Sequence, residues 1–388
     1  MAKYHLYIVL SFLFIMTLIL SNVRSDSLIN LTGDLGQNLS ILYNTYNNFI
    51  PYNDFLPSLL QHTKIDFIHV RTVEFLCNFE FQNTELKDKN LNHLTFHSYF
   101  IVYLIAPFVK IFGDYRFTLE FFNLLSFFGI LYLFYAYLSN NNMKIFLCFL
   151  ACLVITTNPA WSVSILGTFY YDRLYLLFGF LLILATTAKK FNPIFFLAAL
   201  VLSGSVVEKV LIYNSIFLFL YLFFYFFEIE KIKKYYIISA IFIQILLFAS
   251  IAFFWMSEAG SYTDYESNII PQNIINHINN PLMLGKSIYF ISFAIPLLLP
   301  SLIFAPRIFL ISFIMLLPNV FGNLGGAEKV NFATHYHTLY FPFIVFAFAL
   351  GVIQFNKFLI SKKISQKLIS IIFWSKIKIS LIRRGNYV

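Results

Sequence analysis

Six ionisable residues supply the side chains that could carry chemistry in this sequence. They are Asp34, His97, Asp172, Glu208, His335 and His337. A carboxylate can take a proton from a reacting hydroxyl or bind a divalent cation, and a histidine can act as acid or base near neutral pH. Each of the six stands at or near a junction between a polar segment and an apolar run. Ionisable groups are costly at such positions in a membrane protein, and by default they mark a functional site.

Asp34 belongs to the segment Thr32-Gly33-Asp34-Leu35-Gly36-Gln37-Asn38, which follows the first apolar run. Its two glycines allow the backbone to approach a ligand closely. One interpretation is a carboxylate that accepts a proton or holds a cation. The other is a turn in which Asp34 caps a helix from Gln37 to Tyr46. The segment alone favours capping, and the rest of the chain shifts the balance toward function.

The other residues also have structural interpretations. Asp172 and Arg173 would cap a helix over 174–187 or pair with each other, and Glu208 with Lys209 would form a short turn. The two histidines before the last apolar run fit interface residues beside an aromatic belt. Each structural interpretation is favoured for its residue taken singly. Their expected position on one face of the membrane favours a shared site.

The composition places most of this chain in lipid. Of its 388 residues, 59% are hydrophobic and only 12% are charged, and the mean hydropathy is +0.75. Soluble domains average about 45–50% apolar and about 25% charged residues. We therefore expect an all-α, polytopic integral membrane protein. Its net charge of +9 is attributed to topology and contact with anionic lipid, and no nucleic-acid partner is expected.

Apolar runs predict about 10 or 11 transmembrane helices. They lie at 4–20 and at about 117–138, 143–157, 169–187, 191–205, 209–227, 235–256, 286–304, 307–322 and 338–355. A shorter run at 98–112 is broken by Pro107. We interpret it as a juxtamembrane or re-entrant helix, with a full crossing as the alternative.

Basic clusters sort the loops according to the positive-inside rule. If 98–112 does not cross, the clusters at 189–190 and 231–234, Arg307 and the tail all fall on the cytoplasmic side. The polar loops then face outward together with the six ionisable residues. These loops are 21–97, 257–285 and 323–337.

Two regions are expected on this basis. Residues 1–356 would form the transmembrane domain, with 21–97 as a large first outer loop. Residues 357–388 would form a basic, amphipathic cytoplasmic tail that lies on the anionic leaflet of the membrane. We see no convincing internal repeat.

Several short motifs, in a fixed order, resemble those of a family of bacterial and archaeal polytopic membrane proteins called domain of unknown function 2079. The resemblance covers roughly residues 30–355. It rests on Asp34-Leu35-Gly36 before Tyr43-Asn44, His97 before Ala106-Pro107, Val207-Glu208-Lys209, and His335-Tyr336 before Pro342. It implies a multi-pass protein of a bacterial or archaeal cytoplasmic membrane.

The middle block of that family, Asp-Phe-His-Pro-Glu, is altered here to Thr168-Phe169-Tyr170-Tyr171-Asp172. Thr168 and Tyr170 replace the Asp and the His, and Asp172 replaces the Glu. If the chemistry of the family needs that block intact, this member is altered or inactive.

More distantly, the architecture is similar to the GT-C glycosyltransferases, integral membrane enzymes that take sugars from polyprenyl-phosphate donors. This resemblance implies a GT-C-like fold with juxtamembrane helices and sugar transfer on the non-cytoplasmic face. Asp34 would be the catalytic carboxylate, and a bound Mg²⁺ or Mn²⁺ would be held there. The residues that would bind substrate are His97, Asp172, Glu208, His335 and His337, with His335 near the donor phosphate.

Two other functions compete with this one. A transporter or flippase of a lipid-linked or small polar substrate would use the same buried charges to line a pathway. A non-catalytic assembly factor would fit the altered middle block. The sequence shows neither paired broken helices nor internal symmetry, and this favours the enzyme over the transporter.

Overall fold

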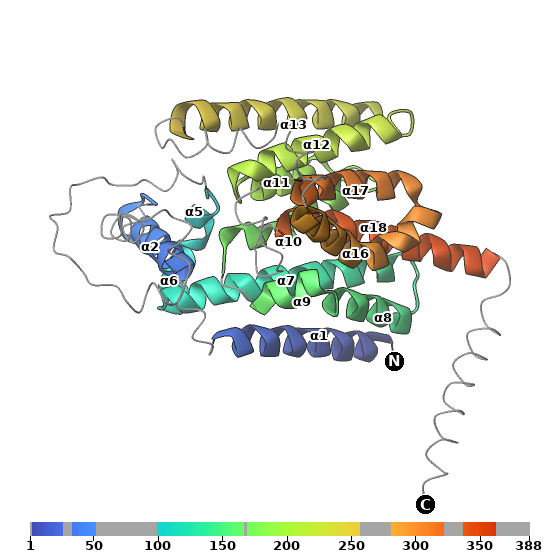
Figure 1. Ribbon diagram of the computed structural model, residues 1–388, viewed down its shortest axis with the longest axis horizontal. Helices are drawn as coiled ribbons and strands as arrows, with labels where there is room; N and C mark the ends of the chain where they lie inside the picture. Colours follow the sequence, from blue (N-terminus) through green and yellow to red (C-terminus); the bar gives the residue numbers. More distant parts are fainter. Residues whose placement is uncertain are drawn as a thin grey trace, which may run out of the picture.

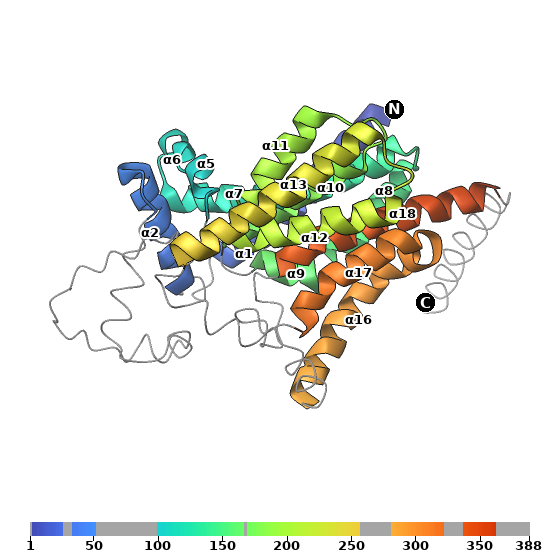
Figure 2. The same cartoon turned by 90° about the horizontal axis from the view of Figure 1, so that it is seen from above.

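The computed structural model describes residues 2–25, 33–51, 99–166, 169–256, 281–321 and 337–361. Every regular element in these ranges is a helix, which confirms the all-α prediction (Figures 1 and 2). The elements are α1 (Ala2–Ser25), α2 (Gly33–Asn48), α5 (Val102–Ile105), α6 (Pro107–Phe112), α7 (Tyr115–Asn140), α8 (Ile145–Thr156), α9 (Pro159–Leu166), η4 (Tyr171–Leu174), α10 (Tyr175–Thr187), α11 (Pro193–Gly204), α12 (Glu208–Tyr225), α13 (Lys231–Ser250), η5 (Ile251–Met256), α16 (Pro281–Phe304), α17 (Pro306–Phe321) and α18 (His337–Ser361).

Four helices in the described residues are long and apolar enough to cross a membrane. They are Tyr115–Asn140, Glu208–Tyr225, Lys231–Phe253 and His337–Ile360. Six shorter apolar helices accompany them. This pattern is consistent with a multi-pass membrane protein, and each described helix of ten or more residues after α2 coincides with a predicted apolar run.

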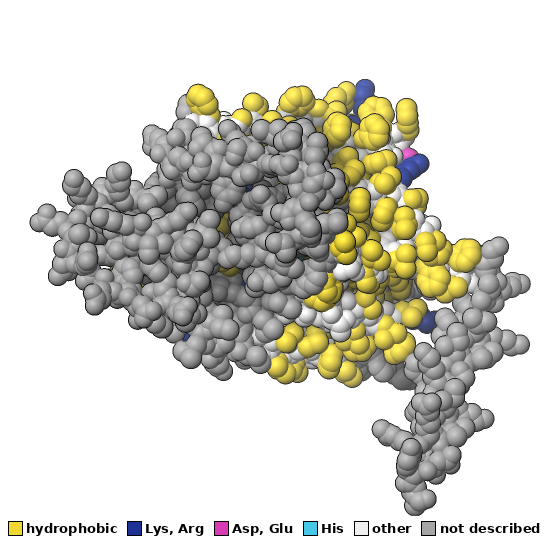
Figure 3. Space-filling view, in the orientation of Figure 1, with side chains coloured by type: hydrophobic (Ala, Val, Ile, Leu, Met, Phe, Trp, Pro, Cys, Tyr) yellow, Lys and Arg dark blue, Asp and Glu magenta, His cyan; other side chains and the backbone are white. Residues whose placement is uncertain are grey.

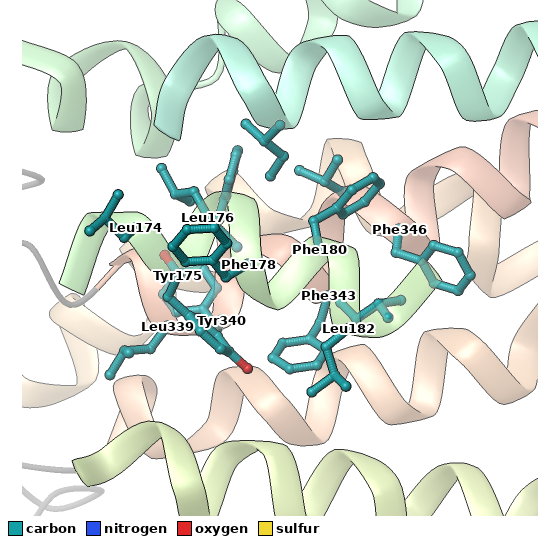
Figure 4. Close-up of a cluster of buried hydrophobic side chains, with 14 of the residues drawn as sticks. Leu174, Tyr175, Leu176, Phe178, Phe180, Leu182, Leu339, Tyr340, Phe343 and Phe346 are labelled. Carbon is teal, nitrogen blue, oxygen red and sulfur yellow. The ribbon is translucent and has the colours of Figure 1, made fainter. Parts of the chain in front are cut away.

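The bundle is built around α18, which packs against α7, α10, α16 and α17. Aromatic side chains of α10 and α18 fill the space between these two helices (Figure 4). The ring centroids of Tyr175 and Phe343 are 6.3 Å apart, and so are those of Phe180 and Phe346. Lipid tails are as apolar as these side chains, so close packing rather than the hydrophobic effect holds such helices together.

The outermost helix of the bundle is α13, at the top of Figure 1. Large hydrophobic side chains such as Phe242 and Leu246 are 64% and 65% exposed along it. Hydrophobic side chains also dominate the described surface in the space-filling view (Figure 3). A surface of this kind suits contact with lipid rather than water.

The short helices α5 and α6 lie beside α2 at one end of the bundle (Figure 1). The amide of Ile101 donates to the Ser205 carbonyl at 2.7 Å, and the Tyr103 hydroxyl donates to the Phe49 carbonyl at 3.3 Å. Together α5 and α6 rise only about 16 Å at 1.5 Å per residue, about half the thickness of a bilayer core. This length suits the juxtamembrane interpretation of 98–112 better than a full crossing.

At its other end α18 continues through Lys357 to Ser361, across the expected boundary between the transmembrane domain and the tail. Residues 362–388 lie outside the described residues, as do most of the first and second polar loops and nearly all of the third.

Candidate functional site

The first turns of α2 are fastened to the segment that precedes η4. The Asn38 side-chain amide donates to the Phe169 carbonyl at 2.7 Å, and the Tyr171 hydroxyl donates to the Asn38 carbonyl at 3.0 Å. Asn38 and Tyr171 are both buried, so these bonds form away from water. These bonds join residues more than 130 positions apart.

Asp34 lies inside α2, one helical turn before Asn38. The expected helix from Gln37 to Tyr46 is too short, because α2 already begins at Gly33 and runs to Asn48. The glycines therefore belong to the first turn of a helix and do not flank a separate turn. An acidic residue is favourable in a first turn because of the helix dipole. The described residues include the backbone of Asp34 and exclude its side chain.

Asp172 and Arg173 lie in η4 and are 1% and 0% exposed. The Arg173 Nη1 donates to the Asn123 side-chain oxygen at 3.0 Å, and the guanidinium carbon lies 5.6 Å from the centroid of the Phe127 ring. The N-cap residue of α10 is Leu174, which makes no side-chain cap. The interpretation that Asp172 or Arg173 is the N-cap of this helix is therefore wrong. Burying two ionisable side chains in a helix bundle is costly, so these two residues differ from polar residues that face water.

Glu208 is the first residue of α12 and is 1% exposed. A carboxylate at a helix N-terminus is favoured by the helix dipole. The short turn expected at Glu208 and Lys209 lies slightly earlier, at Ser205–Val207, between the ends of α11 and α12.

His337 is the first residue of α18 and is also 1% exposed. Its Nδ1 lies 2.6 Å from the Tyr340 hydroxyl, one turn along the same helix. We expected His337 at the membrane interface beside an aromatic belt. The structure instead buries its side chain inside the protein. His97 and His335 fall outside the described residues.

The helices η4–α10, α12 and α18 begin toward the end of the molecule where α2, α5 and α6 lie (Figures 1 and 2). Asp172, Glu208 and His337 are thus carried by helix starts that point to the same end as α2, and α18 contacts η4. The connections with basic residues, between α7 and α8, α12 and α13, and α16 and α17, lie toward the opposite end. Which side of a membrane each end faces stays a prediction.

Sequence reasoning missed a polar network just inside the bundle. The Tyr175 hydroxyl donates to the Asn214 side-chain oxygen at 2.8 Å, and the Asn214 amide donates to the Ser203 hydroxyl oxygen at 3.0 Å. The Tyr213 hydroxyl donates to the Asn319 side-chain oxygen at 2.8 Å. The signal for this network was present, because an Asn inside an apolar run needs a partner.

A break separates α8 from α9, close to the predicted end of the apolar run at residue 157. The Asn158 amide donates to the Phe293 carbonyl of α16 at 2.8 Å, and its side-chain oxygen accepts from the Ala160 amide at 3.0 Å. Pro159 cannot continue the hydrogen-bond ladder of α8. The absence of paired broken helices stays a prediction, since this break is not one of a described pair.

Within the described residues, no group of three or more His, Cys, Asp or Glu side chains could hold a metal ion. The Mg²⁺ or Mn²⁺ expected at Asp34 stays a prediction, since that side chain is outside the described set. Comparisons with protein-family models, with curated proteins and with solved structures gave no match. The motif resemblances therefore stay predictions that rest on the residues quoted for them.

Proposed function

We propose that this protein transfers a sugar from a polyprenyl-phosphate donor at the outer face of a bacterial or archaeal cytoplasmic membrane. Its fold would be GT-C-like, with α5 and α6 as juxtamembrane helices and about 10 transmembrane helices. Asp34 would take the proton of the acceptor hydroxyl or hold a divalent cation against the donor phosphate.

One observation carries the proposal. The helix that contains Asp34 is hydrogen-bonded through Asn38 to the segment directly ahead of Asp172 and Arg173. A catalytic carboxylate must be held within a fraction of an ångström of its productive position, and anchored elements provide this better than free loops. Glu208, His337, His97 and His335 would complete the substrate site around the carboxylate.

The test compares two Asp→Asn variants in reconstituted membranes. Asp34→Asn keeps shape and removes charge, and we expect sugar transfer from polyprenyl-phosphate donors to fall at least about a hundredfold. Asp114→Asn is the matched control, because Asp114 caps α7 by accepting from the Phe117 amide at 2.7 Å. Asn caps a helix nearly as well as Asp, so this variant should keep its activity. Equal activity in Asp34→Asn and wild type would return Asp34 to a structural role.

A second candidate is a transporter or flippase, and two observations favour it. Asp172, Arg173 and Glu208 are at most 1% exposed within the bundle, and at the α8–α9 break the Asn158 side-chain oxygen accepts from the Ala160 amide. Broken helices and buried charges line substrate pathways in many transporters. Translocation of a labelled lipid-linked sugar in the same proteoliposomes, without transfer to any acceptor, would place this candidate ahead.

A further inference from the structure

A cavity of about 450 Å³ lies between α11, α12 and α13, away from the charged residues of the proposed site. Its size falls in the range of roughly 300–1,000 Å³ that is typical of small-molecule sites. Leu200 and Val201 come from α11, Leu211 from α12, and Ile243 and Leu247 from α13. None of the described residues that line it is ionisable, so the cavity suits an apolar occupant without charge.

The mouth of the cavity is part of the lipid-facing surface. Val201, Ile243 and Leu247 line the cavity and are 68%, 52% and 49% exposed. They lie on α11 and α13, and α13 is the outermost helix (Figure 1). In a membrane, the molecules that meet this surface are lipid chains, so a chain can enter from the side.

Among the polar residues that line the cavity, which include Ser205 and Ser250, Gln244 has the longest side chain. It is 2% exposed, and neither its Nε2 nor its Oε1 has a hydrogen-bond partner among the described residues. A buried amide without a partner is costly, and each such group in a folded protein calls for a ligand or another explanation. Because Gln244 lines the cavity and its side chain can rotate about three bonds, a molecule bound there is the nearest source of a partner.

The helix geometry also changes beside the cavity. α13 passes into a π-helical segment, η5, at Ile251, which lines the cavity. Gly204 lines it too, where an added Cβ would meet the flexible end of Leu211 at 3.1 Å. Short π-helical segments occur frequently at functional sites.

We propose that this cavity binds a single-chain lipid whose uncharged end both donates and accepts a hydrogen bond, and that Gln244 binds that end. A long-chain alcohol and a long-chain primary amide share this chemistry. A phosphate or carboxylate end does not, because no described lining residue carries a positive charge. This site does not depend on the proposed sugar transfer, and it has a different ligand from the phosphate-bearing donor.

The test uses the full-length protein in nanodiscs and a hexadecanol probe with a photoreactive group in its chain. We expect saturable labelling of peptides from α11 or α13, with hexadecanol and hexadecanamide as competitors and hexadecyl phosphate at least about tenfold weaker. Gln244→Leu keeps the approximate size of the side chain and removes the amide groups that would donate a hydrogen bond to the bound lipid and accept one from it. It should raise the half-saturating probe concentration about tenfold.

Two tryptophan variants on the same helix separate the cavity from the general surface. Leu247→Trp narrows the mouth and should abolish saturable labelling, whereas Leu246→Trp, at a 65% exposed position outside the cavity lining, should leave it unchanged. If Gln244→Leu does not purify as a monodisperse protein, Gln244→Met takes its place in the same labelling measurement. Wild-type affinity in the Gln244 variant, or equal competition by hexadecyl phosphate, would overturn the proposal. The second result would indicate a groove for the chain of a phosphate-bearing lipid.

Discussion

Asn214 joins three helices through one side chain. It accepts from Tyr175 of α10 and donates to Ser203 of α11, while the Ser203 hydroxyl itself donates to the Leu200 carbonyl at 3.1 Å. All three side chains are fully buried, so each bond forms away from water. Such bonds between helices in membranes average about 0.6 kcal/mol and reach about 1.7 kcal/mol.

We therefore predict that Asn214→Leu costs more than Tyr175→Phe. The first leaves the Tyr175 hydroxyl buried without an acceptor and should lower the free energy of unfolding by about 1–3 kcal/mol. The second removes the donor alone and should cost about 0.5–1.5 kcal/mol. Reversible unfolding in mixed micelles measures both, and a double-mutant cycle isolates their coupling.

Tyr132→Phe is the matched control for these measurements. Tyr132 lies on α7 and is 46% exposed, so loss of its hydroxyl should change the free energy of unfolding by less than about 0.5 kcal/mol. If Tyr175→Phe and Tyr132→Phe destabilise equally, the Asn214 network contributes nothing specific to the fold.

At the scale of elements, α16 and α18 approach each other at a glycine. A Cβ added to Gly351 would come within 3.0 Å of backbone atoms of Pro300 and Ser301, which real Cβ atoms essentially never do. Small residues at such crossings allow two helix backbones to pack closely in a membrane. Gly351→Ala should therefore separate α16 from α18 and lower the free energy of unfolding by about 1–3 kcal/mol. Reversible unfolding in mixed micelles measures this change.

Gly204→Ala provides the comparison for that prediction. Its added Cβ would meet only the flexible end of Leu211, at 3.1 Å, and Ala has the higher helix propensity. We expect a change of less than about 1 kcal/mol. Equal losses in the two variants would mean that helix propensity, rather than backbone contact, governs both positions.

The helices themselves could be predicted from the sequence, since hydropathy alone marks runs such as 191–205 and 338–355. The pairings between helices could not. Asn38 with Phe169 and Tyr213 with Asn319 are joined across more than 100 positions, and hydropathy carries no information on which faces meet. Local rules also failed at α2, where glycines that suggest a turn lie inside a helix because the following turns are held by tertiary contacts.

Of the residues that the sequence singles out, Asp172, Glu208 and His337 are buried at helix starts, and their role in a site stays a prediction. The sequence did not predict Arg173 as the buried partner of Asn123, since a neighbouring Asp–Arg pair also suits an exposed turn. Nor did it predict the Gln244 cavity, because a cavity depends on the shapes of side chains from three helices.

At the scale of the whole molecule, the helix order places two sets of connections at opposite ends. Helix α2 and the start of α18 lie toward one end, and the N-terminus and the last turns of α18 lie toward the other (Figure 1). If α5 and α6 stay at one surface, Asp34 and His335 share a side of the membrane and Lys190 lies on the opposite side. If 98–112 crosses, Asp34 and Lys190 share a side instead.

Cysteine labelling distinguishes these two topologies. The experiment starts from a cysteine-free variant in which Cys77, Cys148 and Cys152 are replaced by Ser or Ala. One cysteine is then introduced at a time, by Asp34→Cys, His335→Cys or Lys190→Cys. We expect an impermeant maleimide to label positions 34 and 335 in intact cells and position 190 only after permeabilisation. Labelling of 34 with 190, and protection of 335, would show that 98–112 crosses the bilayer. In the described structure α7 packs against both α1 and α18, and α6 packs against α7. If 98–112 crossed the bilayer, α5 and α6 would have to take a different position relative to these three helices.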